Sequence, residues 1–166
     1  MSPKEKQKSI FTKAIHSGED RARYADSITT PIVQSSTYFF KDSKEIESYT
    51  KNAKKRYEYG RYGNPTEIVA QQRLMVLNSA DDALVFSSGM MAITTTILAL
   101  VESGDHIVIT DDCYGRTLEF CRTYLKRFGI DCTIVPFGDY ELLDSSIREN
   151  TRFVFSESPT LSLIHI

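Results

Sequence analysis

A serine-glycine turn at residues 86–92 has the composition of an anion-binding site. Ser88 and Gly89 follow a short apolar run that ends at Phe86, and they precede an apolar helical pattern. The first N–H groups of a helix have no partner inside the helix and carry a partial positive charge, which suits a phosphate. Glycine also lets an anion approach the backbone closely. These residues predict phosphate binding, although an ordinary strand-to-helix turn capped by serine also fits them.

Two further loops carry side chains that could act on a ligand of this kind. Tyr114 lies in the segment Asp-Asp-Cys-Tyr-Gly-Arg-Thr at 111–117, and its ring could cover a planar ligand. Tyr59 and Arg61 lie in a tyrosine-rich loop before a helix start at Asn64, and the guanidinium fork of Arg61 suits a phosphate. The spacing matches neither a P-loop nor a dinucleotide fingerprint. From composition alone, both segments also fit loops that pack on their neighbours.

The pattern after Asn64 predicts the elements that would position these loops. Asn-Pro-Thr-Glu at 64–67 has the cap, the proline and the glutamate of a helix N-terminus. We expect helices over 64–78, 88–101, 117–128 and 140–149, and strands over 83–86, 106–110, 132–135 and 152–155. This alternation predicts an α/β fold with a mostly parallel sheet and flanking helices. Ligands bind such sheets beyond the carboxyl ends of the strands, where the loops at 87–89 and 111–117 would lie.

The first 62 residues differ from the rest of the chain. They are polar, rich in tyrosine and only weakly periodic, and we expect no more than a short strand at 37–40 and a short helix at 43–49. Such a segment has too few apolar positions for a core of its own. We therefore predict an extended N-terminal arm that packs on the main domain or on a second subunit.

Length, composition and charge exclude several classes of protein. The chain has 166 residues, 41% of them hydrophobic, with 9 Tyr and 9 Phe, which is enough for one globular core. A net charge of −2 argues against a dedicated nucleic-acid binder. We find no apolar stretch of about 18 residues for a membrane span and no apolar segment of a secretory signal. The 3 cysteines and 3 histidines show no metal-ligand spacing, so we expect no metal site and a reduced, cytoplasmic protein.

Several short motifs, in this order, resemble the Cys/Met metabolism family of pyridoxal-phosphate (PLP) enzymes. The family includes cystathionine γ-synthase, the cystathionine lyases, methionine γ-lyase and the O-acylhomoserine sulfhydrylases. The motifs are Pro-Ile at 31–32, Ser-Ser-Thr-Tyr at 35–38, Tyr-Gly-Arg-Tyr-Gly-Asn-Pro-Thr at 59–66, Ser-Ser-Gly-Met at 87–90, Gly-Asp-His at 104–106, Cys-Tyr-Gly at 113–115 and Ser-Glu-Ser-Pro-Thr at 156–160. The resemblance covers essentially residues 10 to 160. The variant at 57–66 looks most like that of cystathionine γ-synthases.

The resemblance implies a fold and a cofactor. The fold would be part of the large domain of the aspartate aminotransferase-like PLP enzymes (fold type I), and the cofactor pyridoxal 5'-phosphate. The backbone at Gly89 and Met90 would bind the cofactor phosphate. Tyr59 and Arg61 would reach that phosphate from a neighbouring subunit, so the full-length protein would be a homo-oligomer, a dimer or a tetramer.

The resemblance also implies a reaction and its residues. Tyr114 would stack on the pyridine ring and handle a proton as a catalytic residue, and Glu157 would lie in the floor of the pocket. The reaction would be γ-replacement, in which the sulfur of cysteine replaces the acyl group of an O-acylhomoserine, as in transsulfuration and methionine biosynthesis. The partners expected are therefore these small amino acids, with neither nucleic acid nor membrane.

Two departures from the family pattern affect this expectation. Thr160 is followed by Leu-Ser-Leu-Ile-His-Ile, where the family continues with Asn-Pro, and this ending resembles translated sequencing adapter. In addition, the family's Schiff-base lysine and the aspartate that faces the pyridine nitrogen lie beyond residue 160. We therefore expect an inter-subunit arm at 1–62, the N-terminal part of the PLP-binding domain at 63–160, a non-native tail at 161–166, and no activity from this chain alone.

Other functions remain open at this point. A cystathionine γ-lyase or β-lyase, or a sulfhydrylase, would share the same motifs, whereas Arg116 stands where methionine γ-lyases carry a cysteine and disfavours that branch. Outside the family, a non-catalytic nucleotide-binding module would need a glycine-rich first turn, and 87–89 holds a single glycine. A module whose aromatic arm makes only an oligomer contact is the remaining alternative.

Overall fold

The computed structural model describes residues 9–20, 22–51 and 56–160. They form two compact units, Met1–Val85 and Phe86–Ile166, and each is described by itself. The expected non-native tail at 161–166 lies outside the described residues. Within the described ranges, no helix is both long enough and apolar enough to cross a membrane.

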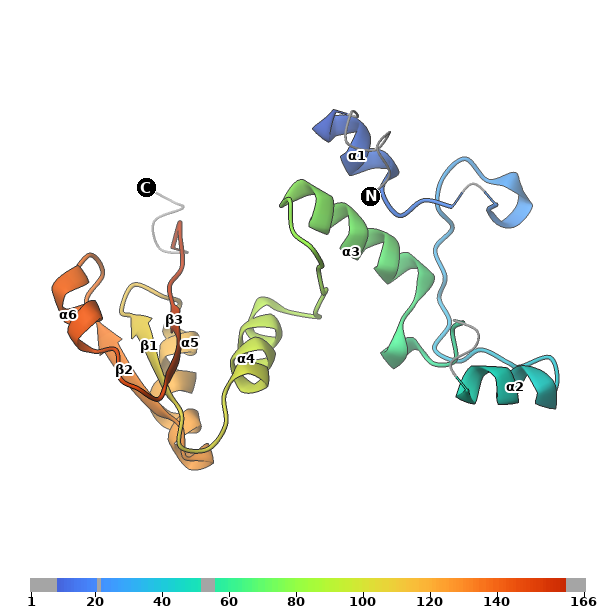
Figure 1. Ribbon diagram of the computed structural model, residues 1–166. Helices are drawn as coiled ribbons and strands as arrows, with labels where there is room; N and C mark the ends of the chain where they lie inside the picture. The colour runs from blue at the N-terminus through green and yellow to red at the C-terminus, as the bar shows by residue number, and fades with distance from the viewer. Residues whose placement is uncertain (1–8, 21, 52–55, 161–166) are drawn as a thin grey trace. The chain divides into compact units, whose positions relative to one another are not determined.

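The first unit consists of helices, short turns and extended chain (Figure 1). Its helices are α1 (Ile10–His16), α2 (Ser43–Thr50) and α3 (Pro65–Leu77), with 3₁₀ turns at Tyr24–Asp26 and Gly60–Tyr62. The side chains of Ser9, Asp42 and Asn64 cap these helices, each by accepting a backbone N–H of the first turn. The expected helices at 43–49 and 64–78 are confirmed. Helix α1, which packs against α3, was not expected from the sequence.

Asn64 joins the start of α3 to the extended chain before it. Its side-chain amide donates to the Val33 carbonyl at 2.9 Å, while the Thr66 hydroxyl accepts from the Val33 N–H at 2.9 Å. Of the short strand expected at 37–40, only one isolated antiparallel bridge forms, between Thr37 and Tyr59. A single bridge does not make a strand, because the neighbouring residues lack ladder partners.

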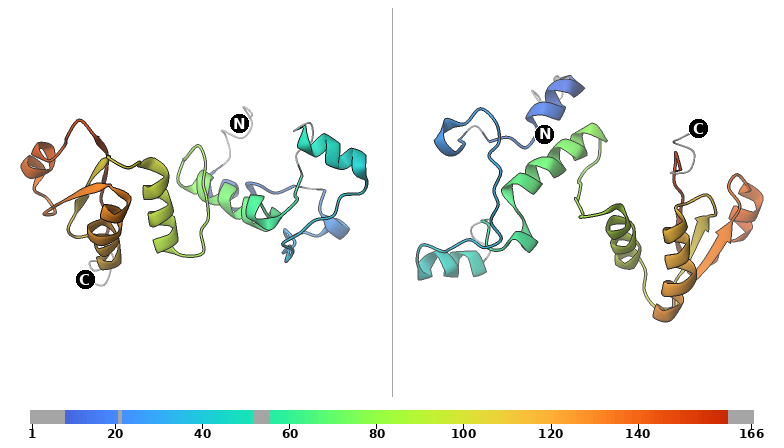
Figure 2. Two further views of the ribbon diagram at one scale, coloured as in Figure 1. Left: turned by 90° about the horizontal axis from the view of Figure 1, so that it is seen from below. Right: turned by 180° about the vertical axis from the view of Figure 1, so that it is seen from behind.

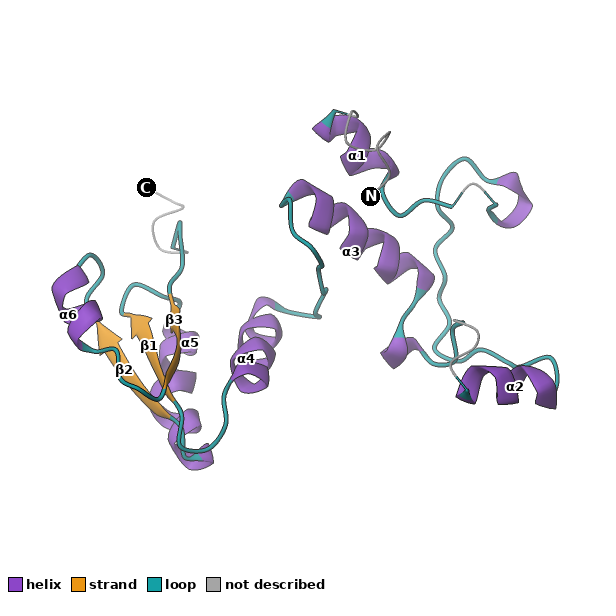
Figure 3. Ribbon diagram, in the orientation of Figure 1, coloured by secondary structure: helices purple, strands orange, loops and turns teal. Residues whose placement is uncertain are grey.

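The second unit is built on a parallel sheet, as predicted. Its strands are β1 (His106–Thr110), β2 (Asp131–Val135) and β3 (Thr151–Phe155), in the order β2-β1-β3 (Figure 3). Both neighbours run parallel to β1. The helices are α4 (Gly89–Leu100), α5 (Gly115–Glu119) and α6 (Tyr140–Ser145), and α5 continues through a π-helical turn (Phe120–Tyr124) and a 3₁₀ turn (Leu125–Phe128).

The strand expected at 83–86 is wrong. Figure 3 draws this stretch as loop between α3 and α4, and its Leu84 side chain is 72% exposed. A strand needs a hydrogen-bonded neighbour, and within the described residues none pairs with this run. Both sides of β1 are already occupied by β2 and β3. The apolar composition alone therefore did not decide the structure.

Two helix boundaries also differ from the sequence prediction. The helix expected over 117–128 starts at Gly115 and is interrupted by the π-helical turn. The helix expected over 140–149 ends at Ser145. Its extension is replaced by a turn in which the Arg148 N–H donates to the Thr151 hydroxyl at 2.7 Å, at the start of β3.

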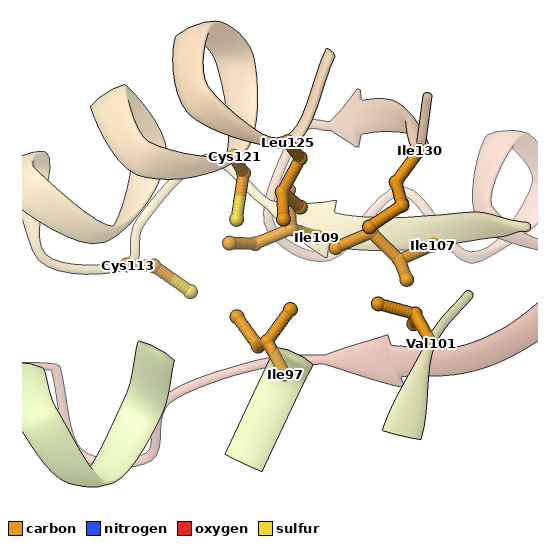
Figure 4. Close-up of a cluster of buried hydrophobic side chains, with 8 residues drawn as sticks. All are labelled: Ile97, Val101, Ile107, Ile109, Cys113, Cys121, Leu125 and Ile130. Atoms are coloured by element: carbon orange, nitrogen blue, oxygen red, sulfur yellow. The ribbon is translucent and has the colours of Figure 1, made fainter. Parts of the chain in front are cut away.

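The hydrophobic core lies on one face of the sheet, between β1 and the helices (Figure 4). Ile107 and Ile109 alternate along β1 and therefore share a face, where Ile97 of α4 and Leu125 of the 3₁₀ turn meet them. Figure 2 shows, from behind, α5 running along the sheet. All five residues of β1 are buried, which is typical of the central strand of a parallel sheet.

His106 links β1 to both neighbouring strands. It is fully buried at the start of β1, and its ring nitrogens hydrogen-bond with the Thr151 hydroxyl on β3 at 2.7 Å and the Thr133 hydroxyl on β2 at 2.8 Å. A buried polar side chain is stable when its hydrogen bonds are satisfied. His106 therefore acts as a structural residue of the sheet.

Candidate functional site

The N-terminus of α4 presents free donors to open space. The Ser88 hydroxyl caps the helix by accepting the Met91 N–H at 3.1 Å, and the Ser88 carbonyl accepts the Ala92 N–H at 3.1 Å. Among the described residues, none accepts a hydrogen bond from the N–H of Gly89 or Met90. A Cβ placed on Gly89 would meet nothing within 4 Å. The end of the helix can therefore receive an anion.

The loops after β1 and β3 meet beside each other. Tyr114 precedes α5, and its backbone N–H donates to Oε2 of Glu157 at 3.1 Å. Glu157 follows β3, which is the direct neighbour of β1, so the carboxyl ends of the two strands bring these residues together. The Tyr114 side chain remains 41% exposed. The hydrogen bond therefore fixes the Tyr114 backbone, while the exposed ring can cover a ligand.

A contact between α5 and α4 completes this arrangement. The hydroxyl of Thr117, which is fully buried in the first turns of α5, donates to the sulfur of Met90 at 3.7 Å. The structure thus brings Gly89 and Met90 to the same edge of the sheet as Tyr114 and Glu157. Thr117 was not singled out from the sequence, and only its place in the first turn after Tyr114 could have indicated it.

Tyr59 and Arg61 belong to the first unit, whereas the other expected site residues belong to the second. Gly60 fixes their turn by donating its N–H to the Ser36 carbonyl at 2.7 Å. The Arg61 guanidinium lies 5.1 Å from the ring centre of Tyr59 and 5.6 Å from that of Tyr62. Within the described residues, no carboxylate forms an ion pair with Arg61, so its charge is oriented by aromatic contacts alone.

The aspartates after β1 were not predicted to matter. Oδ1 of Asp111 accepts the Phe137 N–H at 2.9 Å, which ties the loop after β1 to the loop after β2. Both carboxylate oxygens of Asp112 are buried and have no hydrogen-bond partner among the described residues. The signal available in the sequence was their place directly after a strand, at the edge where ligands bind.

The neighbouring thiol has the surroundings of a structural cysteine. Cys113 is buried and its sulfur lies 3.4 Å from the Thr110 hydroxyl. Burial raises the pKa of the Cys113 thiol, which keeps it protonated at neutral pH. In the described ranges, no group of three or more His, Cys, Asp or Glu side chains could hold a metal ion.

The comparison with known protein families identifies the family of the chain. The model of the Cys/Met metabolism PLP-dependent enzymes matches residues 11–166. The chain belongs to this family. Its members are PLP-dependent, which agrees with the cofactor expected from the motifs.

Relatives of known name match most of the chain. Cystathionine gamma-synthase 1, chloroplastic, of Nicotiana tabacum is 41% identical over 150 residues, covering 89% of this chain and 28% of the relative. The L-methionine gamma-lyase of Treponema denticola is 36% identical over 160 residues, covering 96% of this chain and 40% of the relative. The cystathionine gamma-lyase of Bacillus subtilis is 37% identical over 155 residues, covering 93% of this chain and 38% of the relative. The chain thus spans less than half the length of these relatives.

Solved structures confirm the fold. The crystal structure of metB from Corynebacterium glutamicum is similar with a TM-score of 0.82 and 33% identity, over 94% of this chain and 39% of that one. A Campylobacter jejuni structure, named as an O-acetylhomoserine (thiol)-lyase with a pyridoxyl-lysine monophosphate, gives a TM-score of 0.84 and 28% identity. The match covers 93% of this chain and 38% of that one. The α/β fold with a parallel sheet is therefore the fold of PLP enzymes.

The residues present fit PLP. A phosphate needs backbone donors and open space, which the start of α4 provides at Gly89 and Met90. A pyridine ring needs an accessible aromatic surface, which Tyr114 provides on the same edge of the sheet.

Proposed function

We propose that this chain is the phosphate- and ring-binding part of a cystathionine γ-synthase-like enzyme. In the reaction, the sulfur of cysteine forms a bond to Cγ of an O-acylhomoserine while the acyl group leaves as a carboxylate. The observation that carries the proposal is the meeting of the α4 N-terminus, Tyr114 and Glu157 at one edge of the parallel sheet. The family match and the 41% identity to a cystathionine gamma-synthase support it.

The phosphate is the first group that the protein must recognise. The N–H groups of Gly89 and Met90 donate to its oxygens, helped by the positive end of the α4 dipole. Tyr59 and Arg61 add a hydroxyl and a guanidinium from a neighbouring subunit of a homo-oligomer. The lack of a carboxylate partner for Arg61 among the described residues, and its position over two tyrosine rings, support this role.

Tyr114 acts at the ring and Glu157 positions it. The aromatic face of Tyr114 covers the cofactor, and its hydroxyl holds or moves a proton at the incoming amino group. Glu157 accepts the Tyr114 backbone N–H, so the tyrosine keeps one orientation. PLP, when bound, supplies the electron sink for the loss of protons from the substrate.

The assignment of domains and location is part of the same proposal. Residues 1–62 form the inter-subunit arm, and residues 63–160 belong to the PLP-binding domain. By internal contacts the chain divides later, between Val85 and Phe86, because α3 packs against α1. We also place the protein in the cytoplasm, and the three free thiols support a reducing compartment.

The phosphate role of α4 is tested in a chimaera, because the chain spans 28% of the tobacco relative. The aligned 150 residues of that relative are exchanged for those of this chain. Gly89→Asp places a carboxylate where the phosphate binds, and the open space around Gly89 lets the protein fold. We expect PLP affinity of the apoenzyme to fall by about tenfold or more, because the added carboxylate repels the phosphate that the N–H groups would otherwise bind by charge-assisted hydrogen bonds.

Gly89→Ala is the matched control, since it adds a side chain without charge. Affinity for pyridoxal, which lacks the phosphate, should be nearly equal in both variants. If Gly89→Asp retains PLP as well as Gly89→Ala does, the phosphate does not bind at this helix.

The reaction is tested in the same chimaera with Tyr114→Phe. This change keeps the ring and removes the hydroxyl, so PLP affinity should persist while kcat/KM falls by about 10²–10⁴-fold. The products are measured with cysteine and an O-acylhomoserine. A drop well below tenfold would make Tyr114 a packing residue, and formation of a 2-oxo acid instead of cystathionine would assign the chain to the lyases.

A further inference from the structure

A buried threonine joins α5 to the start of α4. Thr117 is fully buried in the first turn of α5, and its hydroxyl donates to the sulfur of Met90 at 3.7 Å. Met90 is the second residue of α4, and its backbone N–H has no acceptor among the described residues. The contact therefore connects the first turns of the two helices.

The direction of this hydrogen bond is unusual for a threonine inside a helix. Such a hydroxyl commonly donates to the carbonyl three or four residues earlier, as Thr94 does to the Met90 carbonyl at 2.8 Å. The carbonyl three residues before Thr117 belongs to Tyr114. It already accepts two backbone N–H groups, from Thr117 at 2.8 Å and Leu118 at 3.2 Å. The Thr117 hydroxyl instead donates across to α4.

Met90 is held at two points. Its carbonyl accepts the Thr94 hydroxyl, and its sulfur accepts the Thr117 hydroxyl. A methionine side chain is unbranched, has three rotatable bonds and is otherwise free to adopt many conformations. Because Met90 is fixed at both its carbonyl and its sulfur, its N–H keeps one direction.

Thr117 lies between the two groups that recognise PLP in the proposed function. Its N–H donates to the Tyr114 carbonyl at 2.8 Å, while its hydroxyl donates to the Met90 sulfur. One residue thus contacts both the helix end that binds the phosphate and the residue that covers the ring. A ligand with a phosphate and a ring binds more tightly when both sites are preorganised at the right separation.

We propose that Thr117 is a positioning residue that holds the Met90 N–H and Tyr114 in the arrangement that PLP requires. It acts through Met90, because its own hydroxyl is buried and donates to the sulfur. The inference rests on the proposed function, since it takes the start of α4 as the phosphate site. Loss of the hydroxyl should therefore weaken the binding of PLP, which uses both sites, and spare pyridoxal, which lacks the phosphate.

The test uses the chimaera with the tobacco relative. Thr117→Val keeps the shape of the side chain and removes the hydroxyl, whereas Thr117→Ser keeps the hydroxyl and is the matched control. The apoenzyme of each variant is titrated with PLP and with pyridoxal. We expect Thr117→Val to lower PLP affinity by about three- to tenfold, the range for one lost hydrogen bond, and to leave pyridoxal affinity unchanged. Thr117→Ser should retain PLP affinity.

The partner of the hydrogen bond gives a second test. Met90→Leu removes the sulfur and should weaken PLP binding to a similar extent, and adding Thr117→Val to it should have no further effect, since the two residues share one interaction. Hydrogen exchange of the Met91 and Ala92 amides, which bond to Ser88, needs no cofactor. It should be faster in both single variants than in Thr117→Ser.

Three results would overturn the positioning role. They are unchanged PLP affinity in Thr117→Val, an equal loss of PLP and pyridoxal affinity, which would indicate general packing, and a loss in Thr117→Ser as large as in Thr117→Val. If Gly89→Asp weakens PLP binding and Thr117→Val does not, only this inference fails. If neither does, the proposed function fails and this inference fails with it. Should Thr117→Val not fold, Met90→Leu decides by the same criteria.

Discussion

The first unit, Met1–Val85, buries none of its described residues, whereas the second unit buries the whole hydrophobic cluster around β1. In the first unit, ion pairs make contacts that a core would otherwise make. The Glu19 carboxylate binds Arg23 at 2.8 Å and Arg73 at 2.7 Å, which joins the segment after α1 to α3. Arg56 similarly binds Glu45 at 2.7 Å and lies 4.1 Å from the ring centre of Phe40.

The difference teaches how each unit holds its share of the candidate site. Apolar burial stabilises by about 25 cal/mol per Å² and does not depend on direction, so the core can support Gly89 and Tyr114 firmly. The turn that carries Arg61 is held instead by directional contacts, which are the Gly60 N–H donating to the Ser36 carbonyl and the guanidinium lying over two tyrosine rings. The ion pairs elsewhere in the first unit contribute roughly 0–1 kcal/mol each, as is usual near the surface. We therefore expect the second unit to respond to loss of volume and the first unit to respond to loss of charge.

The largest effect should come from removing volume in the second unit. Ile109 is fully buried, and Ile109→Ala should cost about 2–5 kcal/mol through lost burial and a residual cavity. Ile32→Ala, in the first unit, removes the same atoms from a side chain that is 76% exposed and should cost less than about 0.5 kcal/mol. Unfolding in urea, followed for each unit by peptide-resolved hydrogen exchange, measures the change in free energy of unfolding for both variants. Equal costs would show that the first unit has a core of its own.

The same contrast explains which parts of the fold the sequence predicted. The β-branched run at 106–110 and the helix signals at Asn64 and Gly89 depend on local patterns that burial then reinforces, and these elements formed as expected. The run at 83–86 failed, because an apolar run becomes a strand only beside a partner. Helix α1 was missed, although Ser9 is a suitable cap, because its stability comes from packing against α3.

The candidate site was predictable to a similar extent. Gly89 and Tyr114 follow from the rule that ligands bind at the carboxyl ends of parallel strands. Glu157 came only from the family resemblance, because its contact with Tyr114 requires β3 to be the neighbour of β1. Thr117 was missed because its contact with Met90 requires α5 to pack against α4. Asp112 was missed because the burial of its carboxylate is a property of the folded chain and not of the local pattern.

A second effect concerns how the stability of the second unit depends on pH. Burial, followed by the charge of Arg148, lowers the pKa of His106 below its ordinary value of 6.5, while Asp131 opposes this. The unfolded chain then binds a proton more readily than the folded chain does. The stability of the second unit should therefore be complete above 6.5 and fall as the pH drops below it.

Protection factors of β1 amides between pH 7.5 and 5, chosen as roughly one unit or more on each side of the unfolded histidine pKa, measure this effect. His106→Gln keeps polar groups between the two threonines and removes the titration, so its protection should be flat over this range. A similar decline in the variant would mean that another group is responsible.

The smallest effect should come from Glu19, and it lies in a different pH range. The hydrogen bond with His16 lowers the pKa of Glu19, the charges of Arg23 and Arg73 add to this, and burial opposes it. Because the folded pKa is the lower one, this contribution to stability is present above the ordinary value of 4.5 and is lost as the pH falls through the folded pKa.

Glu19→Gln should lower the free energy of unfolding of the first unit by about 1 kcal/mol at pH 7. This is the upper end for exposed ion pairs, since the carboxylate is largely covered. Glu149→Gln, an exposed glutamate of the second unit, is the control and should change neither unit. Hydrogen exchange of α1 and α3 against that of β1 separates the outcomes: if Glu19→Gln also lowers the protection of β1, the two units do not respond independently, and the contrast between core and ion-pair stabilisation does not hold.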